Sequence, residues 1–166
     1  DDTGSATVIG NTIAQDPTVS GISIAGMSVS YCQRVTVTGN TVKGTNDATV
    51  GASTSRTSLT SIGVKSLTVS GNDLQWNTTG LVGSMPSGTY SIFLHNVTNF
   101  SIVGNFITAY PGSGAPTFYA LTVDHNVGES HGIFASNMLY GDPTVATSIN
   151  VNELNSSVVY FDIACS

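Results

Sequence analysis

A short phrase centred on Gly-Asn recurs along this chain at a nearly constant interval. Its clearest copy is Val37–Val42 (VTGNTV), and further copies place asparagines at positions 11, 72, 105 and 137, the last of them after serine instead of glycine. Successive asparagines are 29, 32, 33 and 32 residues apart. Apolar residues alternate before each corner, and no 3.6-residue periodicity runs through the phrase. The repeat therefore predicts a unit of strand, tight turn and strand.

The Gly-Asn pair predicts a sharp corner, because Gly and Asn enter left-handed backbone conformations at the lowest cost. When the corners of successive repeats stack, the side-chain amides form a ladder in which each asparagine bonds to those above and below. Strands then pair with the strand one repeat away instead of with their sequence neighbour. The pattern predicts an all-β parallel solenoid.

Length and charge limit the possible partners. A chain of 166 residues predicts one domain, 1–166, of about five to six coils. The net charge of −6, with four Lys and Arg residues in total, argues against nucleic acid or an anionic membrane surface, because both need a basic footprint. No run approaches ~18 apolar residues, so we expect no membrane insertion.

The ends of the sequence suggest a processed protein or a piece of a longer chain. The first residue is Asp1 instead of Met. Neither end carries an obvious capping segment, and an open solenoid end exposes apolar core and unpaired strand edges. We therefore expect either truncation or an end that stacks on another subunit.

Three polar segments, 43–60, 75–90 and 109–117, indicate surface loops that leave the same corner of consecutive coils. Such loops would build one wall of a groove, which is where ligands commonly bind on rods of this kind. Trp76 lies in the second segment and Tyr119 lies just after the third. Both are candidates for stacking on sugar rings.

The recurring corner, with three strands per coil and an asparagine ladder, resembles the pectate-lyase-like superfamily. This group includes pectinases, polysaccharide lyases and the trimeric tailspikes of bacteriophages. The resemblance covers residues 6–163 and implies a single-stranded right-handed parallel β-helix. It also implies that the strand after each long loop carries the sugar site on its outer face.

We predict the candidate site by stacking these strands on their alternate apolar residues. The residues expected to face inward are Met27/Val29, Ile62/Val64, Ile92/Leu94, Leu121/Val123 and Ile149/Val151. The outward residues then form one column of Ser28, Gly63, Phe93, Thr122 and Asn150, and a second of Ser30, Lys65, His95, Asp124 and Asn152. Tyr31, Asn96, His125 and Glu153 flank them at the strand ends. Most of the scarce ionisable groups thus gather on one face.

Three interpretations of this face remain open. In the first, Lys65, His95, Asp124 and Glu153 are catalytic: a Lys or His beside a carboxylate removes a proton from a uronic acid, or Asp124 and Glu153 act as a glycosidase pair. In the second, the face binds sugar without chemistry. The ligand-binding candidates are Tyr31, Phe93, Asn96, His125, Trp76 and Tyr119. In the third, Lys65, His95 and Asp124 form an exposed cross-strand salt bridge that contributes about 0.3 kcal/mol to stability.

These features favour an extracellular or virion-borne module of the tailspike type that recognises cell-surface polysaccharide. The alternatives are a polysaccharide lyase or glycoside hydrolase acting on acidic polysaccharide, and a self-stacking subunit of a filament or surface layer. A homo-oligomer is expected, either a trimer, as the resemblance implies, or an end-to-end stack. We expect no cofactor and no metal, because zinc-ligand spacing, a P-loop and a dinucleotide fingerprint are absent from the sequence. Glu129 and His131 are interpreted as loop polarity instead of metal ligands.

Overall fold

The fold is all-β throughout the part of the chain that the computed structural model describes, residues 4–14, 24–45, 56–77, 89–110, 118–125, 129–141, 148–153 and 158–164. A six-stranded sheet, called the β1 sheet, contains β1 (Ser5–Ile9), β4 (Arg34–Thr38), β7 (Ser66–Ser70), β10 (Asn99–Val103), β13 (Glu129–Ala135) and β16 (Val158–Ala164). The five-stranded β2 sheet contains β2 (Thr12–Ala14), β5 (Thr41–Thr45), β8 (Asp73–Asn77), β11 (Phe106–Tyr110) and β14 (Met138–Gly141). The five-stranded β3 sheet contains β3 (Ile24–Ser30), β6 (Arg56–Ile62), β9 (Thr89–His95), β12 (Phe118–His125) and β15 (Ser148–Glu153).

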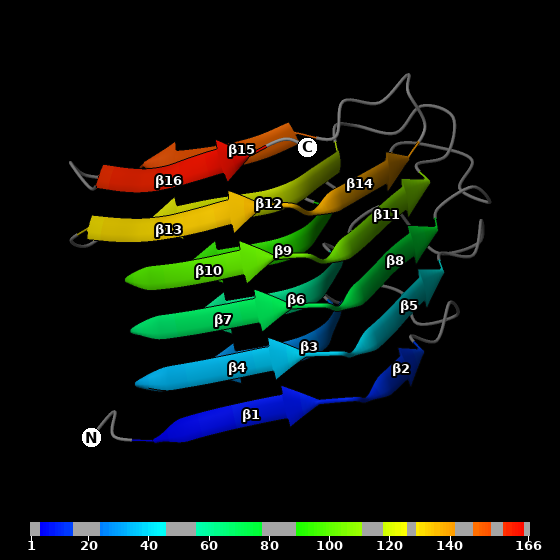
Figure 1. The fold of residues 1–166 in the computed structure, drawn as a ribbon, viewed down its shortest axis with the longest axis horizontal. Helices are drawn as coiled ribbons and strands as arrows, with labels where there is room; N and C mark the ends of the chain where they lie inside the picture. The colour runs from blue at the N-terminus through cyan, green and yellow to red at the C-terminus, as the bar shows by residue number, and fades with distance from the viewer. Residues whose placement is uncertain are drawn as a thin grey trace.

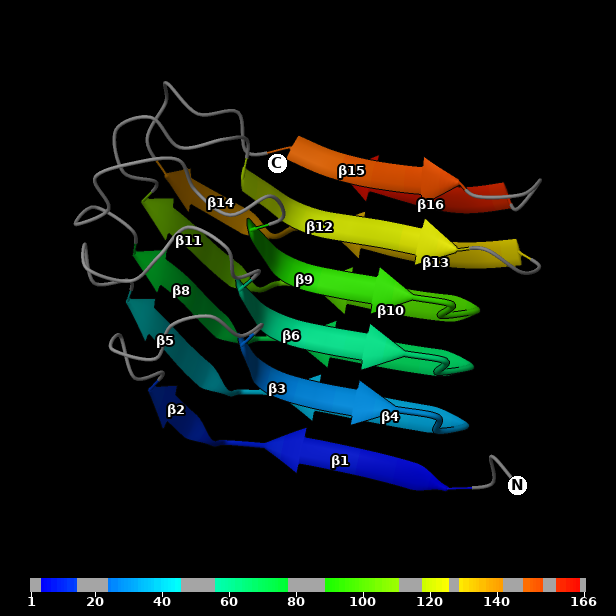
Figure 2. The same ribbon diagram turned by 180° about the vertical axis from the view of Figure 1, so that it is seen from behind.

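Consecutive strands belong to the three sheets in rotation, and every strand pairs in parallel with the strand three places along the chain (Figure 1, and from behind in Figure 2). The β1 and β4 strands, for example, pair with Val8 opposite Val37, which is one repeat later. The prediction of an all-β fold in which strands pair one repeat away is confirmed. The arrangement is compatible with a parallel β-solenoid. Among the described residues there is no helix long and apolar enough to cross a membrane.

The predicted asparagine ladder is present. The side-chain Oδ1 of Asn40 accepts hydrogen bonds from the backbone N and the Nδ2 of Asn11, both at 3.0 Å. Asn72, Asn105 and Asn137 each accept the same pair of bonds from the preceding asparagine, at 2.9 to 3.0 Å. Asn40, Asn72 and Asn105 are almost completely buried, so these bonds satisfy amides that water does not reach.

The residue before each ladder asparagine has a left-handed backbone. Gly39 and Gly71 have φ angles of 64° and 61°, and a Cβ added to either would meet no atom within 4 Å. Glycine is therefore favoured there by backbone conformation and not by lack of space. Ser136 takes the same conformation, with φ 52°, at the last described rung.

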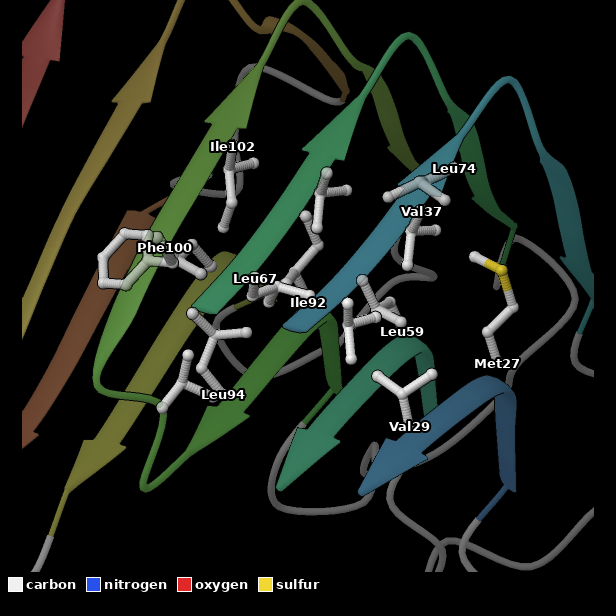
Figure 3. Packing of buried hydrophobic residues seen from close by; sticks show 14 of the residues in the cluster. Met27, Val29, Val37, Leu59, Leu67, Leu74, Ile92, Leu94, Phe100 and Ile102 are labelled. Atoms are coloured by element: carbon white, nitrogen blue, oxygen red, sulfur yellow. The ribbon is translucent and has the colours of Figure 1, made fainter. Parts of the chain in front are cut away.

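The core lies between the three sheets and is built of vertical columns of side chains. In the β1 sheet one column contains Val35, Leu67 and Phe100, and all three are buried. Figure 3 shows Leu67 from this sheet and Ile92 from the β3 sheet pointing into the same interior. Burying a side chain of this size contributes about 1.5–3 kcal/mol relative to leaving it exposed. Packing of columns, with few charges, therefore accounts for most of the stabilisation.

The predicted alignment of β6 was wrong. We expected Ile62 and Val64 to face inward and to stack on Ile92 and Leu94, but Leu59 pairs with Ile92 and Ser61 pairs with Leu94. Val64 is buried as expected, although it lies after the end of β6 and not within it. Leu59 and Ser61 are buried, and Ile62 lies opposite His95 on the outer face. The expected loop 43–60 also extended too far, because β5 ends at Thr45 and β6 begins at Arg56. The error arose because the alignment placed apolar residues on apolar residues, whereas a serine occupies an interior position here.

Candidate functional site

The candidate site lies on the outward face of the β3 sheet, which faces the viewer in Figure 2. One outward column contains Ser28, Thr60, Phe93 and Thr122, and the neighbouring column contains Ser30, Ile62, His95 and Asp124. Asn150 and Asn152 of β15 continue the two columns in register, but their side chains lie outside the described residues. Because side chains alternate along a strand, all the described members of both columns project from the same face.

His95 and Asp124 form the central contact of this face. Their backbones are directly opposite each other in the pairing of β9 with β12, and His95 Nδ1 lies 2.9 Å from Asp124 Oδ2. The two side chains are 26% and 18% exposed, so a molecule in solution can reach both. An ionised carboxylate can only accept a hydrogen bond, so Nδ1 carries a proton in this pair, and in the neutral imidazole Nε2 is then an acceptor.

Asn96 extends this contact into a chain of three side chains. Its Nδ2 lies 3.2 Å from His95 Nε2, at a distance suited to donation from the amide to the ring nitrogen. The backbone of Asn96 is left-handed, with φ 53°, and its N–H donates to the carbonyl oxygen of Asp124 at 2.9 Å. The Asn96–His95–Asp124 chain therefore holds the imidazole ring at both nitrogens.

An aromatic ring lies beside the chain. The rings of Phe93 and His95 are nearly parallel, with 12° between their planes and 6.4 Å between their centroids. Both residues are half-buried and belong to the same strand, β9. Phe93 is in register with Thr122 on β12, so the site combines an apolar ring with polar groups over two adjacent strands.

Two polar atoms on β12 have no hydrogen-bond partner. They are Asp124 Oδ1 and Thr122 Oγ1, and each is enclosed by surrounding atoms. Thr122 is only 3% exposed although its position in the strand is outward. A buried polar group without a partner costs about 1–3 kcal/mol. Such groups therefore call for an explanation, and they lie next to the His95 pair.

Tyr31 occupies the corner that follows β3. Its φ is 54°, a left-handed conformation that costs a non-glycine residue about 1–2 kcal/mol. The next coil has Gly63 at the equivalent corner, and a Cβ on Gly63 would lie 2.9 Å from Cδ1 of the Tyr31 ring. The ring therefore covers the backbone of Gly63, yet the residue remains 67% exposed. Tyr31 presents an aromatic surface at the edge of the face.

Lys65 does not lie in the predicted outward column with His95 and Asp124. Because Ile62 lies opposite His95, Lys65 comes after the corner at Gly63 and belongs to the turn that leads into β7. Its backbone N donates to Cys32 O at 3.1 Å, and its side chain is exposed. The prediction that Lys65 belongs to the same outward column as His95 and Asp124 was therefore wrong, whereas the predicted adjacency of His95 and Asp124 is confirmed.

The remaining predicted residues are placed only in part. The backbones of His125 and Glu153 are paired between β12 and β15, and Trp76 lies within β8 of the β2 sheet instead of in a loop. The side chains of these three residues lie outside the described residues. Tyr119 lies on β12 and is half-buried. Segments 46–55, 78–88 and 111–117, which contain most of the predicted groove wall, also lie outside the description.

Sequence reasoning missed two members of this face, Thr60 and Ile62, which occupy the positions predicted for Gly63 and Lys65. Ile62 was assigned to the core. Thr122 was correctly predicted to be outward, but not to be enclosed. The signal for Ile62 was Gly63, because a glycine two residues before Lys65 marks a corner and not a strand interior. No signal in the sequence alone reports the burial of Thr122, which depends on neighbouring strands.

Within the described ranges, no three His, Cys, Asp or Glu side chains gather closely enough to hold a metal ion. No protein-family model, curated protein or solved structure matches the chain. What the site can do must therefore be argued from its own geometry.

Proposed function

We propose that this chain recognises a cell-surface polysaccharide through the outward face of the β3 sheet. The observation that carries the proposal is the Asn96–His95–Asp124 hydrogen-bonded chain on a partly exposed surface, with the Phe93 ring parallel to the imidazole. A sugar offers both hydroxyl groups and an apolar C–H face. The polar chain suits the hydroxyl groups, and the aromatic ring suits the C–H face.

Preorganisation supports binding at this face. The imidazole of His95 is held by Asp124 on one side and Asn96 on the other, and all three residues come from paired strands or the corner that follows them. A ligand that binds to groups already fixed in place avoids the entropy cost of ordering them. The neighbouring position on β6 is Ile62, which adds apolar surface next to the polar chain.

The same proposal includes a finer description of the fold and setting. We propose that the three sheets form one right-handed parallel β-helix of the pectate-lyase-like, tailspike type. Parallel strands connected through a crossover are right-handed in about 98% of cases, which supports this hand. A trimeric state and a location outside the cell or on a virion are proposed with it, and rest on the resemblance of the Gly-Asn corners to tailspike-type repeats.

The test is binding of the purified chain to an array of neutral and acidic cell-surface glycans. We expect His95→Ala to weaken binding by about tenfold or more, because it removes both hydrogen bonds of the ring. The matched control is Gln75→Ala on the outer face of the β2 sheet, which also loses a side-chain hydrogen bond, 2.7 Å to Asp73 Oδ2. A folded wild-type chain that binds no glycan on the array would refute the proposal.

Catalysis is a second candidate, favoured by the 2.9 Å contact between His95 Nδ1 and Asp124 Oδ2. A carboxylate that orients an imidazole is the usual arrangement for a general base. Incubation with the glycan that binds, followed by assays for new reducing ends and for unsaturated uronic products, separates the two candidates. Turnover that disappears in His95→Ala selects the enzyme, and binding without any product selects the recognition module.

A further inference from the structure

We infer that the site selects a neutral sugar that donates its hydroxyl hydrogens, and not a uronic acid or another anionic sugar. This inference rests on the proposed function and adds the chemical class of the ligand. Two observations support it. Polar atoms of β9 and β12 accept hydrogen bonds, and two of them, on β12, have no partner. Lys65 also lies outside the outward column that contains His95 and Asp124.

The polar atoms of the site chiefly accept hydrogen bonds. Asp124 Oδ1 is an acceptor without a partner. In the neutral imidazole, His95 Nε2 is an acceptor because Nδ1 carries the proton that is donated to Asp124 Oδ2. Its bond to Asn96 is 3.2 Å long, at the weak end of the range, so a hydroxyl group can compete for it. A ligand that matches these atoms must bring O–H donors.

Thr122 adds a third hydrogen-bonding position. Its Oγ1 lacks a partner and lies on the same strand and face as Asp124, two residues away. Strand geometry separates two such side chains by about 6.8 Å, a span that one hexose with hydroxyl groups on both sides can bridge. Both Asp124 Oδ1 and Thr122 Oγ1 are enclosed, so a bound sugar must displace the side chains that cover these two atoms before its hydroxyl groups can reach them.

The charge of the column Ser30, Ile62, His95 and Asp124 disfavours an anionic ligand. The described residues in register on this face are Ser30, Ile62, His95 and Asp124, and no Lys or Arg is among them. Asp124 would lie next to the carboxylate of a bound uronic acid, and both groups can only accept hydrogen bonds. Two carboxylates at such a short distance repel each other. The protein as a whole also carries a net charge of −6, which adds to the repulsion of an anionic ligand. The hydroxyl groups of a neutral sugar are not repelled by Asp124 and can donate hydrogen bonds to it.

The experiment measures dissociation constants for neutral hexose oligosaccharides (gluco-, manno- and galacto-hexaose) and for hexagalacturonate by calorimetry, guided by the glycan array. We expect at least one neutral glycan to bind about tenfold more tightly than every uronic acid glycan. Asp124→Asn keeps the size of the side chain but replaces an acceptor oxygen with an amide donor. We expect it to weaken neutral binding about tenfold and to reduce the discrimination against hexagalacturonate.

The matched control is Asp73→Asn on β8. Asp73 also has an enclosed Oδ1 without a partner, while its Oδ2 accepts from Gln75, and it faces outward on the β2 sheet. The substitution changes the net charge by the same amount and should leave binding unchanged. Equal losses in Asp73→Asn and Asp124→Asn would overturn the inference, because the effect would then come from overall charge.

A second variant, Thr122→Val, separates ligand contact from structure. It removes a hydroxyl group that has no partner, so stability should stay constant or rise, while neutral binding falls severalfold. Unchanged binding would overturn the contact with Thr122. Tighter binding of hexagalacturonate than of any neutral glycan would overturn the inference and leave the proposed function intact. No binding to any glycan by the folded chain would overturn both.

Discussion

The two described corners of each coil use the same backbone conformation for opposite purposes. At the corner between the β1 and β2 sheets, a left-handed residue precedes an asparagine whose side chain turns inward and bonds to the next rung. At the corner that follows the β3 sheet, the left-handed residue is Tyr31, then Gly63, then Asn96 on successive coils. The first corner repeats because its side chains must fit one another. The second varies because its side chains face solvent, where each coil is free to carry a different group.

The largest expected effect is at the first corner. Asn72→Ala removes the acceptor of Asn40 N and Nδ2, and it also removes the donor to Val37 O and Asn105 Oδ1. Buried groups are left without partners, so we expect a loss of about 3 kcal/mol in the free energy of unfolding. Urea titration measures it. The control Asn99→Ala removes an exposed amide that donates to Lys65 O at 3.2 Å, and should cost less than about 0.5 kcal/mol.

A smaller effect tests the backbone of the same corner. Gly39→Ala meets no atom within 4 Å, so its cost comes from the left-handed φ alone, and we expect a loss of about 1–2 kcal/mol. Ser136→Gly is the reverse change at the equivalent position of a later rung, with φ 52°. It should stabilise the fold by up to about 1 kcal/mol, as measured by urea titration. A loss of stability in Ser136→Gly would show that backbone conformation does not govern this corner.

The smallest effect on stability is expected at the second corner. Tyr31→Asn installs the residue type that Asn96 provides at the same corner two coils later, and asparagine tolerates the left-handed region better than tyrosine. We expect the free energy of unfolding to change by less than about 1 kcal/mol. Glycan affinity should fall, because the exposed ring is lost. A large loss of stability with unchanged affinity would show that Tyr31 serves the fold instead of the ligand.

The same contrast explains which parts of the fold the sequence could predict. The ladder was predictable because Asn40, Asn72 and Asn105 recur at the interval of one coil, and the buried corner permits little variation. The register of β6 was not, because Ser61 occupies a core position between Val29 and Leu94, and the apolar Ile62 is outward. Alternation of apolar residues fails as a guide wherever a small polar residue is enclosed.

The candidate site was predictable to a similar extent. The adjacency of His95 and Asp124 followed from Ile92 and Leu94 stacking on Leu121 and Val123, a register that the structure confirms. The lack of partners for two atoms of β12 could not be foreseen, because it depends on how the surrounding residues pack around them in the folded chain. The functional roles of these residues remain predictions.

The ladder has a direction, and this affects how the chain can assemble. Each Oδ1 takes two bonds from the asparagine that precedes it in the sequence, so every rung is completed by the one synthesised after it. Each turn of the chain is then stabilised almost entirely by its contacts with the turns directly before and after it. Loss of one rung in the middle weakens the coupling between the turns on either side of it, so the unfolding transition in urea should broaden as well as shift.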